Sequence, residues 1–252
     1  MAQFDDLADV YDLLVPWEGR LKRETPFLTT LFQQHKIQSV LDTACGTGRH
    51  AVRLAQMGFD VVGTDISPSM IREARRHARK LGAKVKLIPL AFAELGSHFK
   101  NQADSVLCLG NSLAACGSRS AAKNALKNFA TCLRPDGLLI MQILNFVGMR
   151  SANDRFESPK SGTKDGVEYL LFKFFDLDRP QVTLNMNIFT RDSNKAWSRR
   201  GFSKKLYSPT STELRQLVRD AGFCRIKLYG NHQFESYHRN SDQLLLTAMR
   251  KK

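Results

Sequence analysis

Short apolar runs alternate with amphipathic segments over the first 145 residues. The runs are rich in Val, Leu and Ile and predict strands, whereas the segments between them place apolar residues at helical spacing. The predicted strands are residues 39–44, 59–65, 85–90, 103–110 and 138–145. The predicted helices are residues 5–35, 48–58 and 119–133, and a further helix that begins after its N-cap Ser67 and ends at Gly82. The first of them has a break near Pro16. This alternation is typical of a doubly wound, parallel sheet.

The pattern changes after Asn145. Residues 168–177, 182–191 and 196–207 read as successive strands without helices between them, and the turn Asp178-Arg179-Pro180 suits a hairpin. A helix at 211–221 and strands at 223–229 and 243–249 follow. We therefore predict one α/β domain, residues 1–252. It has a Rossmann-like, mostly parallel sheet of seven strands whose last strand is antiparallel, and an antiparallel insertion at residues 150–207.

Composition narrows the class of protein. With 252 residues, 42% of them hydrophobic, the chain suits a single domain, and no uninterrupted apolar stretch is long enough for a membrane span. The acidic N-terminus does not resemble a signal peptide. The five cysteines form no C-x-x-C pair and the six histidines no metal-binding cluster. These features predict a cytoplasmic protein with reduced thiols and without a metal site.

The net charge of +14 attracts anionic partners, nucleic acids included. No nucleic-acid-binding motif accompanies it, so we interpret most of the charge as solvated helix and loop faces.

The segment VLDTACGTGRHA, residues 40–51, carries the clearest chemical signal. It predicts a strand, a tight turn through Gly46 and Gly48, and a helix N-terminus. Such a turn lets a ligand contact bare backbone, and the unpaired N–H groups of the helix face it. A nucleotide-like ligand is expected.

Two carboxylates discriminate among such ligands. Asp65, at the end of the second predicted strand, can accept the ribose hydroxyls of an NAD-like or an adenosyl ligand. Asp42, at the end of the first, repels a pyrophosphate but attracts an ammonium or sulfonium group. The pair therefore favours S-adenosylmethionine as the cofactor over a dinucleotide.

The motifs DTACGTG, GTDIS and LRPDGLL resemble those of class I S-adenosylmethionine-dependent methyltransferases, with Ala44 at the usual first glycine of the first motif. The resemblance is strong from Val40 to Asn145. The segments LCLGNSLA and ALKNFATCLRPDGLL resemble glycine N-methyltransferase and its bacterial relatives, which methylate small molecules at nitrogen.

The resemblance implies roles for individual residues. Asp42, Ala44 and Gly46 would line the methionine part of the cofactor. Asp65 would hold the ribose, and Arg20 the carboxylate. The full set of implied cofactor-binding residues is Trp17, Arg20, Asp42, Ala44, Cys45, Gly46, Asp65, Ile66, Met70, Ala91, Phe92, Leu109 and Gly110. The implied catalytic residues are Tyr11, in a segment that closes over the site, and Asn111, beside the methyl group.

The chain departs from the family pattern at two places. Many members carry an acid after the third strand, but here Ala91 and Phe92 follow it, so backbone N–H groups or Glu94 would contact the adenine. Leu144 stands where the glycine enzyme has an arginine for the substrate carboxylate, and Arg150 could replace that arginine from the following loop.

We predict methyl transfer to a small-molecule acceptor, at nitrogen, by in-line displacement that depends mainly on proximity and alignment. Tyr11, His232 and Tyr237 are the candidate bases. The insertion would form a lid or the acceptor wall, in which Arg199, Arg200, Lys204 and Lys205 could meet an anionic acceptor. The alternatives are an RNA or DNA methyltransferase, a non-enzymatic adenosyl-ligand-binding protein and an NAD-dependent oxidoreductase. The acceptor and the oligomeric state stay open.

Overall fold

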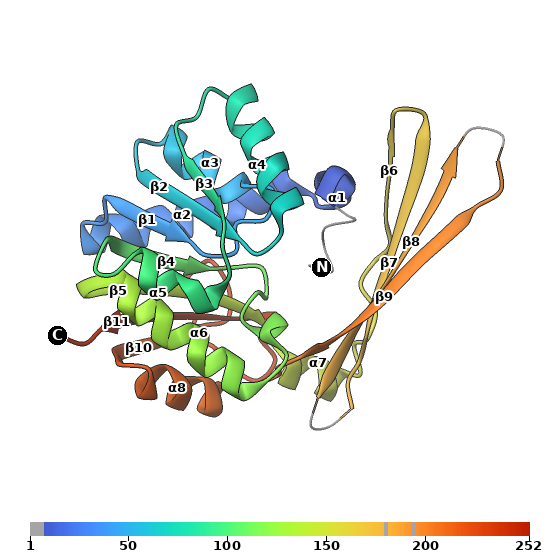
Figure 1. The fold of residues 1–252 in the computed structure, drawn as a ribbon. Coiled ribbons are helices and arrows are strands. Elements are labelled where there is room, and N and C mark those ends of the chain that lie inside the picture. Colours follow the sequence, from blue (N-terminus) through green and yellow to red (C-terminus); the bar gives the residue numbers. More distant parts are fainter. Residues whose placement is uncertain (1–7, 179–180, 193–194) are drawn as a thin grey trace.

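The computed structural model describes residues 8–178, 181–192 and 195–252, which form two β-sheets and the helices around them (Figure 1). The larger sheet has seven strands in the order β10-β11-β5-β4-β1-β2-β3. Their bounds are β1 Ser39–Asp42, β2 Asp60–Asp65, β3 Lys86–Pro89, β4 Ala103–Cys108, β5 Leu133–Leu144, β10 Phe223–Tyr229 and β11 Gln243–Arg250. Only β11 runs antiparallel to its neighbours. The predicted sheet is confirmed.

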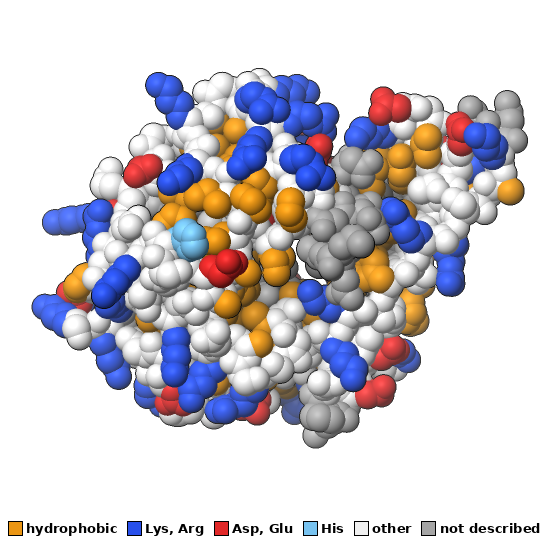
Figure 2. Space-filling view, viewed as in Figure 1, with side chains coloured by type: hydrophobic (Ala, Val, Ile, Leu, Met, Phe, Trp, Pro, Cys, Tyr) orange, Lys and Arg blue, Asp and Glu red, His pale blue; other side chains and the backbone are white. Residues whose placement is uncertain are grey.

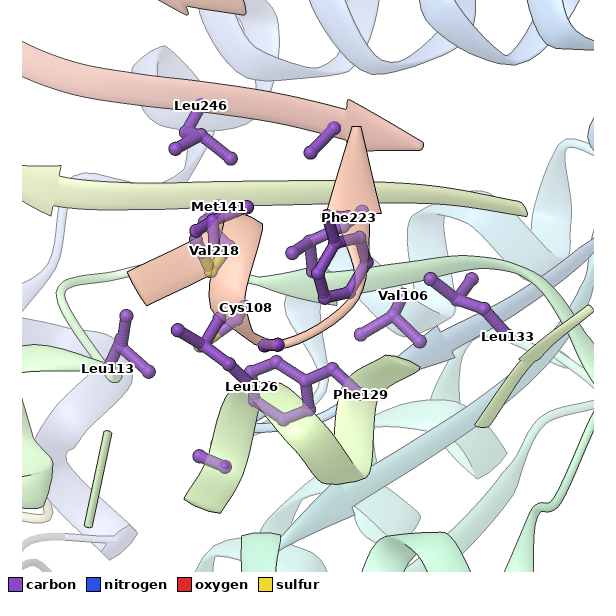
Figure 3. Close-up of a cluster of buried hydrophobic side chains, with 14 of the residues drawn as sticks. Val106, Cys108, Leu113, Leu126, Phe129, Leu133, Met141, Val218, Phe223 and Leu246 are labelled. Carbon is purple, nitrogen blue, oxygen red and sulfur yellow. The ribbon is translucent and has the colours of Figure 1, made fainter. Parts of the chain in front are cut away.

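Helices cover both faces of this sheet, because successive side chains of each strand point to opposite faces. In β4, Leu107 belongs to the apolar core on one face, whereas Val106 and Cys108 belong to the core on the other. The first core includes α2 Trp17–His35, α3 Arg49–Gln56 and α4 Pro68–Lys80. The second includes α5 Leu95–His98, α6 Arg119–Cys132 and α8 Ser211–Asp220. Figure 3 shows part of the second core, where Phe129 and Leu126 of α6 pack near Phe223 and Met141.

The helices begin where the sequence offers capping side chains. Ser67 Oγ accepts the Met70 backbone N–H at 3.1 Å and starts α4, and Thr210 and Glu213 form a reciprocal capping box at α8. A first helix, α1 Ala8–Leu14, is separated from α2 at Pro16, as predicted. The beginning of the predicted first helix, residues 5–7, lies outside the described residues.

The second sheet is antiparallel and projects from the main body (Figure 1). Its strands are β6 Lys160–Lys164, β7 Val167–Asp176, β8 Val182–Asp192 and β9 Ser198–Leu206, in that order. β7, β8 and β9 correspond to predicted strands. Residues 179 and 180 of the predicted hairpin turn lie outside the described residues. Inward-facing β8 residues pack with Phe146 and Phe175 into a third core.

Several local predictions were incomplete or wrong. The strand β6 and the helices α5 and α7 Phe146–Ala152 were not predicted. β5 begins at Leu133 rather than at residue 138, and its pairing with β4 shifts from Ala103↔Leu133 to Ser105↔Leu138. The expected RPDG turn is therefore a bulge within the strand, with Asp136 in the left-handed region at φ +62°.

No helix in the described part of the chain is long and apolar enough to cross a membrane.

Candidate functional site

A cavity of about 400 Å³ lies where the carboxyl ends of the parallel strands meet the second sheet. Gly46, Asp65, Gly110 and Asn111 line it from the large sheet, and Tyr11 and Arg20 from α1 and α2. Side chains of β6, β7, β8 and β9 form the opposite wall. On the face drawn in Figure 2, Lys and Arg side chains are spread over the main body and the second sheet rather than gathered in one stripe.

The Asp65 carboxylate organises the glycine turn at one end of the cavity. Its Oδ2 accepts the Gly46 backbone N–H and its Oδ1 the Ser67 backbone N–H, each at 2.9 Å. Gly46 adopts φ +55°, and a Cβ built there meets no atom within 4 Å, so its backbone is open to a ligand. Gly48 differs, because a Cβ there would lie 2.9 Å from Ala74 Cβ of α4. Gly46 thus leaves its backbone open at the cavity, and Gly48 allows α4 to pack closely against the turn.

Hydrogen bonds to Asp12 hold helix α1 over this turn. Asp12 Oδ1 accepts the Thr47 hydroxyl at 2.5 Å, and Asp12 Oδ2 accepts Arg49 Nε at 2.8 Å. These bonds place Tyr11 of α1 against the cavity. Burial raises the pKa of the Tyr11 phenol, which therefore stays neutral at physiological pH.

Arg20 is held in a buried ionic cluster rather than exposed on the surface. Its Nε donates to Glu24 Oε1 at 2.9 Å, and His50 Nε2 lies 2.7 Å from Glu24 Oε2. The Arg20 guanidinium carbon also lies 4.9 Å from the centre of the Trp17 ring. Burial by itself raises the pKa of Glu24, but the His50 hydrogen bond and the Arg20 charge outweigh it and lower the pKa to about 2. Glu24 is thus an anion that fixes the guanidinium beside the cavity.

The end of β4 forms the cavity floor. The Gly110 backbone N–H donates to Gln142 Oε1 at 2.7 Å, and Asn111 Oδ1 accepts the Leu144 backbone N–H at 3.1 Å. Gly110 and Asn111 have φ +66° and +67°. A Cβ on Gly110 would lie 3.5 Å from Arg20 Nη2, so backbone and guanidinium meet closely there. These bonds join the ends of β4 and β5 under the cavity.

Comparison with known proteins agrees with this geometry. Residues 40–137 match a family described as "Methyltransferase domain". The chain is 26% identical to a glycine/sarcosine N-methyltransferase of Aphanothece halophytica, across 98% of the chain and 89% of that protein. A solved S-adenosylmethionine-dependent methyltransferase from Clostridium acetobutylicum has the same fold, with a TM-score of 0.79 at 17% identity over 99% of both chains. Residues 40–137 therefore form a methyltransferase domain of the class I, S-adenosylmethionine-dependent type.

A second relative of the methyltransferase is the glycine/sarcosine N-methyltransferase of Parasynechococcus marenigrum. The identity is 34% over 142 residues, which make up 56% of the chain. That alignment spans half the length of the relative.

The predicted site residues of the methyltransferase fall into two groups. One group lines the cavity: Tyr11, Arg20, Ala44, Gly46, Asp65, Met70, Gly110 and Asn111. The other does not line it: Trp17, Asp42, Cys45, Ile66, Ala91, Phe92 and Leu109. In that second group Trp17 packs on Arg20 and His50, Cys45 and Leu109 are buried, and Ile66 is 66% exposed.

The residues after the third strand are engaged elsewhere. Glu94 Oε2 accepts the Ala91 backbone N–H at 3.1 Å. The Phe92 ring packs on Phe129 at 5.1 Å between ring centres, in the core under the sheet. Neither the Glu94 side chain nor the Phe92 ring lines the cavity.

Asp42 is buried behind the cavity, with 2% of its surface exposed. Burial raises the pKa of its carboxyl from 3.8 to about 6, and the neighbouring Asp65 charge acts in the same direction. His50 and the Ala44 backbone N–H oppose this shift. Asp42 therefore destabilises the fold when it ionises, unless a cation lies nearby.

An Asp42→Asn variant is expected to remove this pH dependence. Because the folded-state pKa of Asp42 is raised, its contribution to stability is fully present below pH 3.8 and is lost as the pH rises through about 6. Relative to the wild type, the Asn variant should gain about 3 kcal/mol of unfolding free energy between pH 4 and pH 8. Urea titrations at both pH values measure this gain. If the two proteins differed in unfolding free energy by the same amount at pH 4 and at pH 8, the raised pKa of Asp42 would be contradicted.

The predicted alternative bases and anion-binding residue lie away from the cavity. The Tyr237 hydroxyl donates to Asn145 Oδ1 at 2.9 Å, and the His232 ring packs against Phe27 at 5.5 Å between centres. Arg150 binds the Leu177 carbonyl and Ser208 Oγ. Arg150 therefore does not take the place of the arginine that Leu144 replaces. Within the described ranges, no group of three His, Cys, Asp or Glu could hold a metal ion.

Sequence reasoning missed several residues that line the cavity, among them Gln142 at its floor and Glu157, Lys160 and Lys173 on the side of the second sheet. Lys173 interrupts the apolar run of β7, which is a signal that could have drawn attention to it. Glu157 precedes β6 in a segment without apolar periodicity, so its position depends on the tertiary fold alone.

Proposed function

We propose that this protein transfers the methyl group of S-adenosylmethionine to the nitrogen of a small-molecule acceptor. The observation that carries the proposal is a cavity that joins the Asp65–Gly46 turn and Arg20 to a second wall formed by the antiparallel sheet. The N-methyltransferase relatives support nitrogen as the acceptor atom. A cytoplasmic location belongs to the proposal and is supported by the five cysteines, none of which forms a disulfide.

The residues at the cavity fit this cofactor. The Asp65 carboxylate accepts the backbone N–H groups of Gly46 and Ser67, and a carboxylate at this place suits the ribose hydroxyls as further donors. The Arg20 guanidinium, fixed by Glu24, suits the cofactor carboxylate. The open backbone at Gly46 allows close approach, and Met70 supplies an apolar surface for the adenine. When bound, the cofactor supplies a methyl group already activated by a sulfonium.

The remaining catalytic work falls to the walls of the cavity. Phe175, Leu184 and Met186 give the second sheet an apolar surface that excludes water from the reacting atoms. Asn111 and Gly110 fix the floor, so the acceptor is aligned by rigid elements. Glu157 is a carboxylate on the acceptor side and can accept the proton that an amine must lose.

A labelled-methyl assay across amines, alcohols and tRNA tests the proposal. We expect label in at least one small amine, at a rate about a hundredfold or more above that of the alcohol of matched size, because an alcohol needs a stronger base than the cavity offers. Incorporation into tRNA but into none of the amines would contradict the proposal. Mass spectrometry of the co-purified ligand adds an independent test, since NAD would overturn the cofactor assignment.

A further inference from the structure

One part of the cavity is apolar on both of its walls. Leu144, at the end of β5, and Ala115, in the segment between β4 and α6, line it from the main body. Side chains of β7 and β8 line it from the second sheet. We call this part of the cavity the apolar slot, and its residues are Ala115, Leu144, Leu171, Phe175, Leu184 and Met186.

The alternation of side chains in β7 and β8 brings the second-sheet residues of the slot to one face. In β7 the residues that line the cavity are Leu171, Lys173 and Phe175, which alternate along the strand. The register pairs Phe175 with Leu184, and Lys173 with Met186. Both β8 residues of the slot therefore lie on the same face as the cavity-lining residues of β7.

The slot keeps apolar surface that a ligand can cover. Its most buried members, among them Phe175, belong to the third core. Ala115, Leu144 and Leu171 pack against the same core but are only partly buried. Removing the rest of their apolar surface from water is favourable, and an apolar group placed between the two walls achieves this.

Charged side chains also line the wall of the second sheet. Lys173 pairs with Glu157, with 2.5 Å between Nζ and Oε1, and its Nζ lies 5.5 Å from the centre of the Phe175 ring. Lys160 and Lys204 line the cavity as well and are partly buried. The carbon stem of a lysine adds apolar surface, while its ammonium turns to polar surroundings. An apolar group can therefore pack against these stems as well as against the slot.

We infer that the methyl acceptor is an amine with an apolar body, and that this body fills the apolar slot. This inference rests on the proposed function. The cavity floor at Asn111 offers polar contacts to the acceptor nitrogen, and the slot begins one hydrogen bond away, where the Leu144 N–H donates to Asn111 Oδ1. An acceptor that spans both parts leaves its nitrogen at the floor and its apolar body between the two walls.

A series of amines of increasing chain length tests the inference. Methylamine, n-propylamine and n-pentylamine serve as probes in the labelled-methyl assay. We expect kcat/KM to rise about fourfold for each added methylene, because each one is buried in the slot. The compound 5-aminopentanoate has the length of n-pentylamine but ends in a carboxylate, and it should be at least about tenfold poorer, because the slot would have to bury that charge. If 5-aminopentanoate were the better acceptor of the two, the inference would be wrong.

Leu171→Asn and Leu170→Asn form a matched pair of variants. The two leucines are neighbours on β7, but only Leu171 lines the cavity. Leu171→Asn should lower kcat/KM for n-pentylamine about tenfold and leave the value for methylamine within about twofold, because methylamine has no chain to place in the slot. Leu170→Asn should behave as the wild type with both amines. An unchanged dependence on chain length in Leu171→Asn, or the same loss in Leu170→Asn, would contradict the inference.

A binding measurement separates this inference from the proposed function. Calorimetry with n-propylamine and n-pentylamine, on the protein saturated with S-adenosylhomocysteine, requires no turnover. We expect n-pentylamine to bind about fifteenfold more tightly than n-propylamine and with a more negative heat-capacity change. If S-adenosylhomocysteine binds, an amine is methylated and the two amines bind equally, the inference is wrong and the proposed function stands. If S-adenosylhomocysteine itself fails to bind, the proposed function is wrong and the inference falls with it.

Discussion

An Asp65→Ala variant is expected to bind S-adenosylhomocysteine about 100- to 1000-fold more weakly than the wild type. The change leaves the backbone N–H groups of Gly46 and Ser67 without their acceptor and removes the carboxylate proposed to hold the ribose. Each hydrogen bond to a charged group contributes about 1.5–3 kcal/mol, so the loss of two bonds near the lower end of that range, about 3–4 kcal/mol in total, corresponds to the expected weakening. Isothermal titration calorimetry at constant ionic strength measures the difference.

Asp60→Ala is the control for this experiment, because Asp60 begins the same strand, at its other end, and is exposed. It should bind with wild-type affinity. Asp65→Asn keeps one acceptor oxygen and should fall between the two. Wild-type affinity in a folded Asp65→Ala protein, with an unchanged circular dichroism spectrum, would remove Asp65 from the cofactor site.

The large sheet could be predicted because its signals are local. Buried parallel strands are short apolar runs, and the intervening helices carry their own caps, such as Ser67 at α4. The cofactor side of the cavity could be predicted for the same reason. Gly46 follows one strand and Asp65 ends the next, at the same edge of the sheet. The two residues, 19 positions apart in the sequence, are therefore joined by a hydrogen bond.

The acceptor side depends on contacts that periodicity does not encode. Alternation in a strand indicates two faces but not which face meets another part of the protein, so Lys204 and Lys205 were equivalent in the sequence. The structure turns only Lys204 toward the cavity. Arg150 was a reasonable candidate by position, yet α7 directs it to Ser208.

The missed elements owe their conformation to tertiary packing. The β6 sequence KSGTK has no apolar residue, and the strand forms because its backbone pairs with β7. Helix α7 has only seven residues, too few to be stable alone. It is held by Asn145, whose Oδ1 accepts the Gly148 N–H at 3.2 Å, and by the buried Phe146.

A Glu24→Gln variant is expected to lose about 3–5 kcal/mol of unfolding free energy at pH 7, because it leaves Arg20 and His50 in a buried site without their anion. The Glu24 side chain is 4% exposed, so solvent screens these interactions little. Since the folded-state pKa is about 2 and the ordinary value is 4.5, the stabilisation is fully present above pH 4.5 and is lost as the pH falls toward 2. The deficit of the variant should shrink by about 3 kcal/mol over this window. Denaturant titrations from pH 2 to pH 7 measure it.

Glu18→Gln, on the exposed first turn of the same helix, is the control and should change stability little at any of these pH values. A deficit of the Glu24 variant that did not depend on pH would show that packing, and not the carboxylate charge, is responsible. Glu24 and Asp42 act in adjacent pH windows and in opposite directions: protonation of Asp42 stabilises the fold as the pH falls from about 6, and protonation of Glu24 destabilises it below 4.5. The double variant, with Asn at 42 and Gln at 24, should therefore lack the maximum in stability that this buried cluster gives the wild type between pH 4 and pH 5.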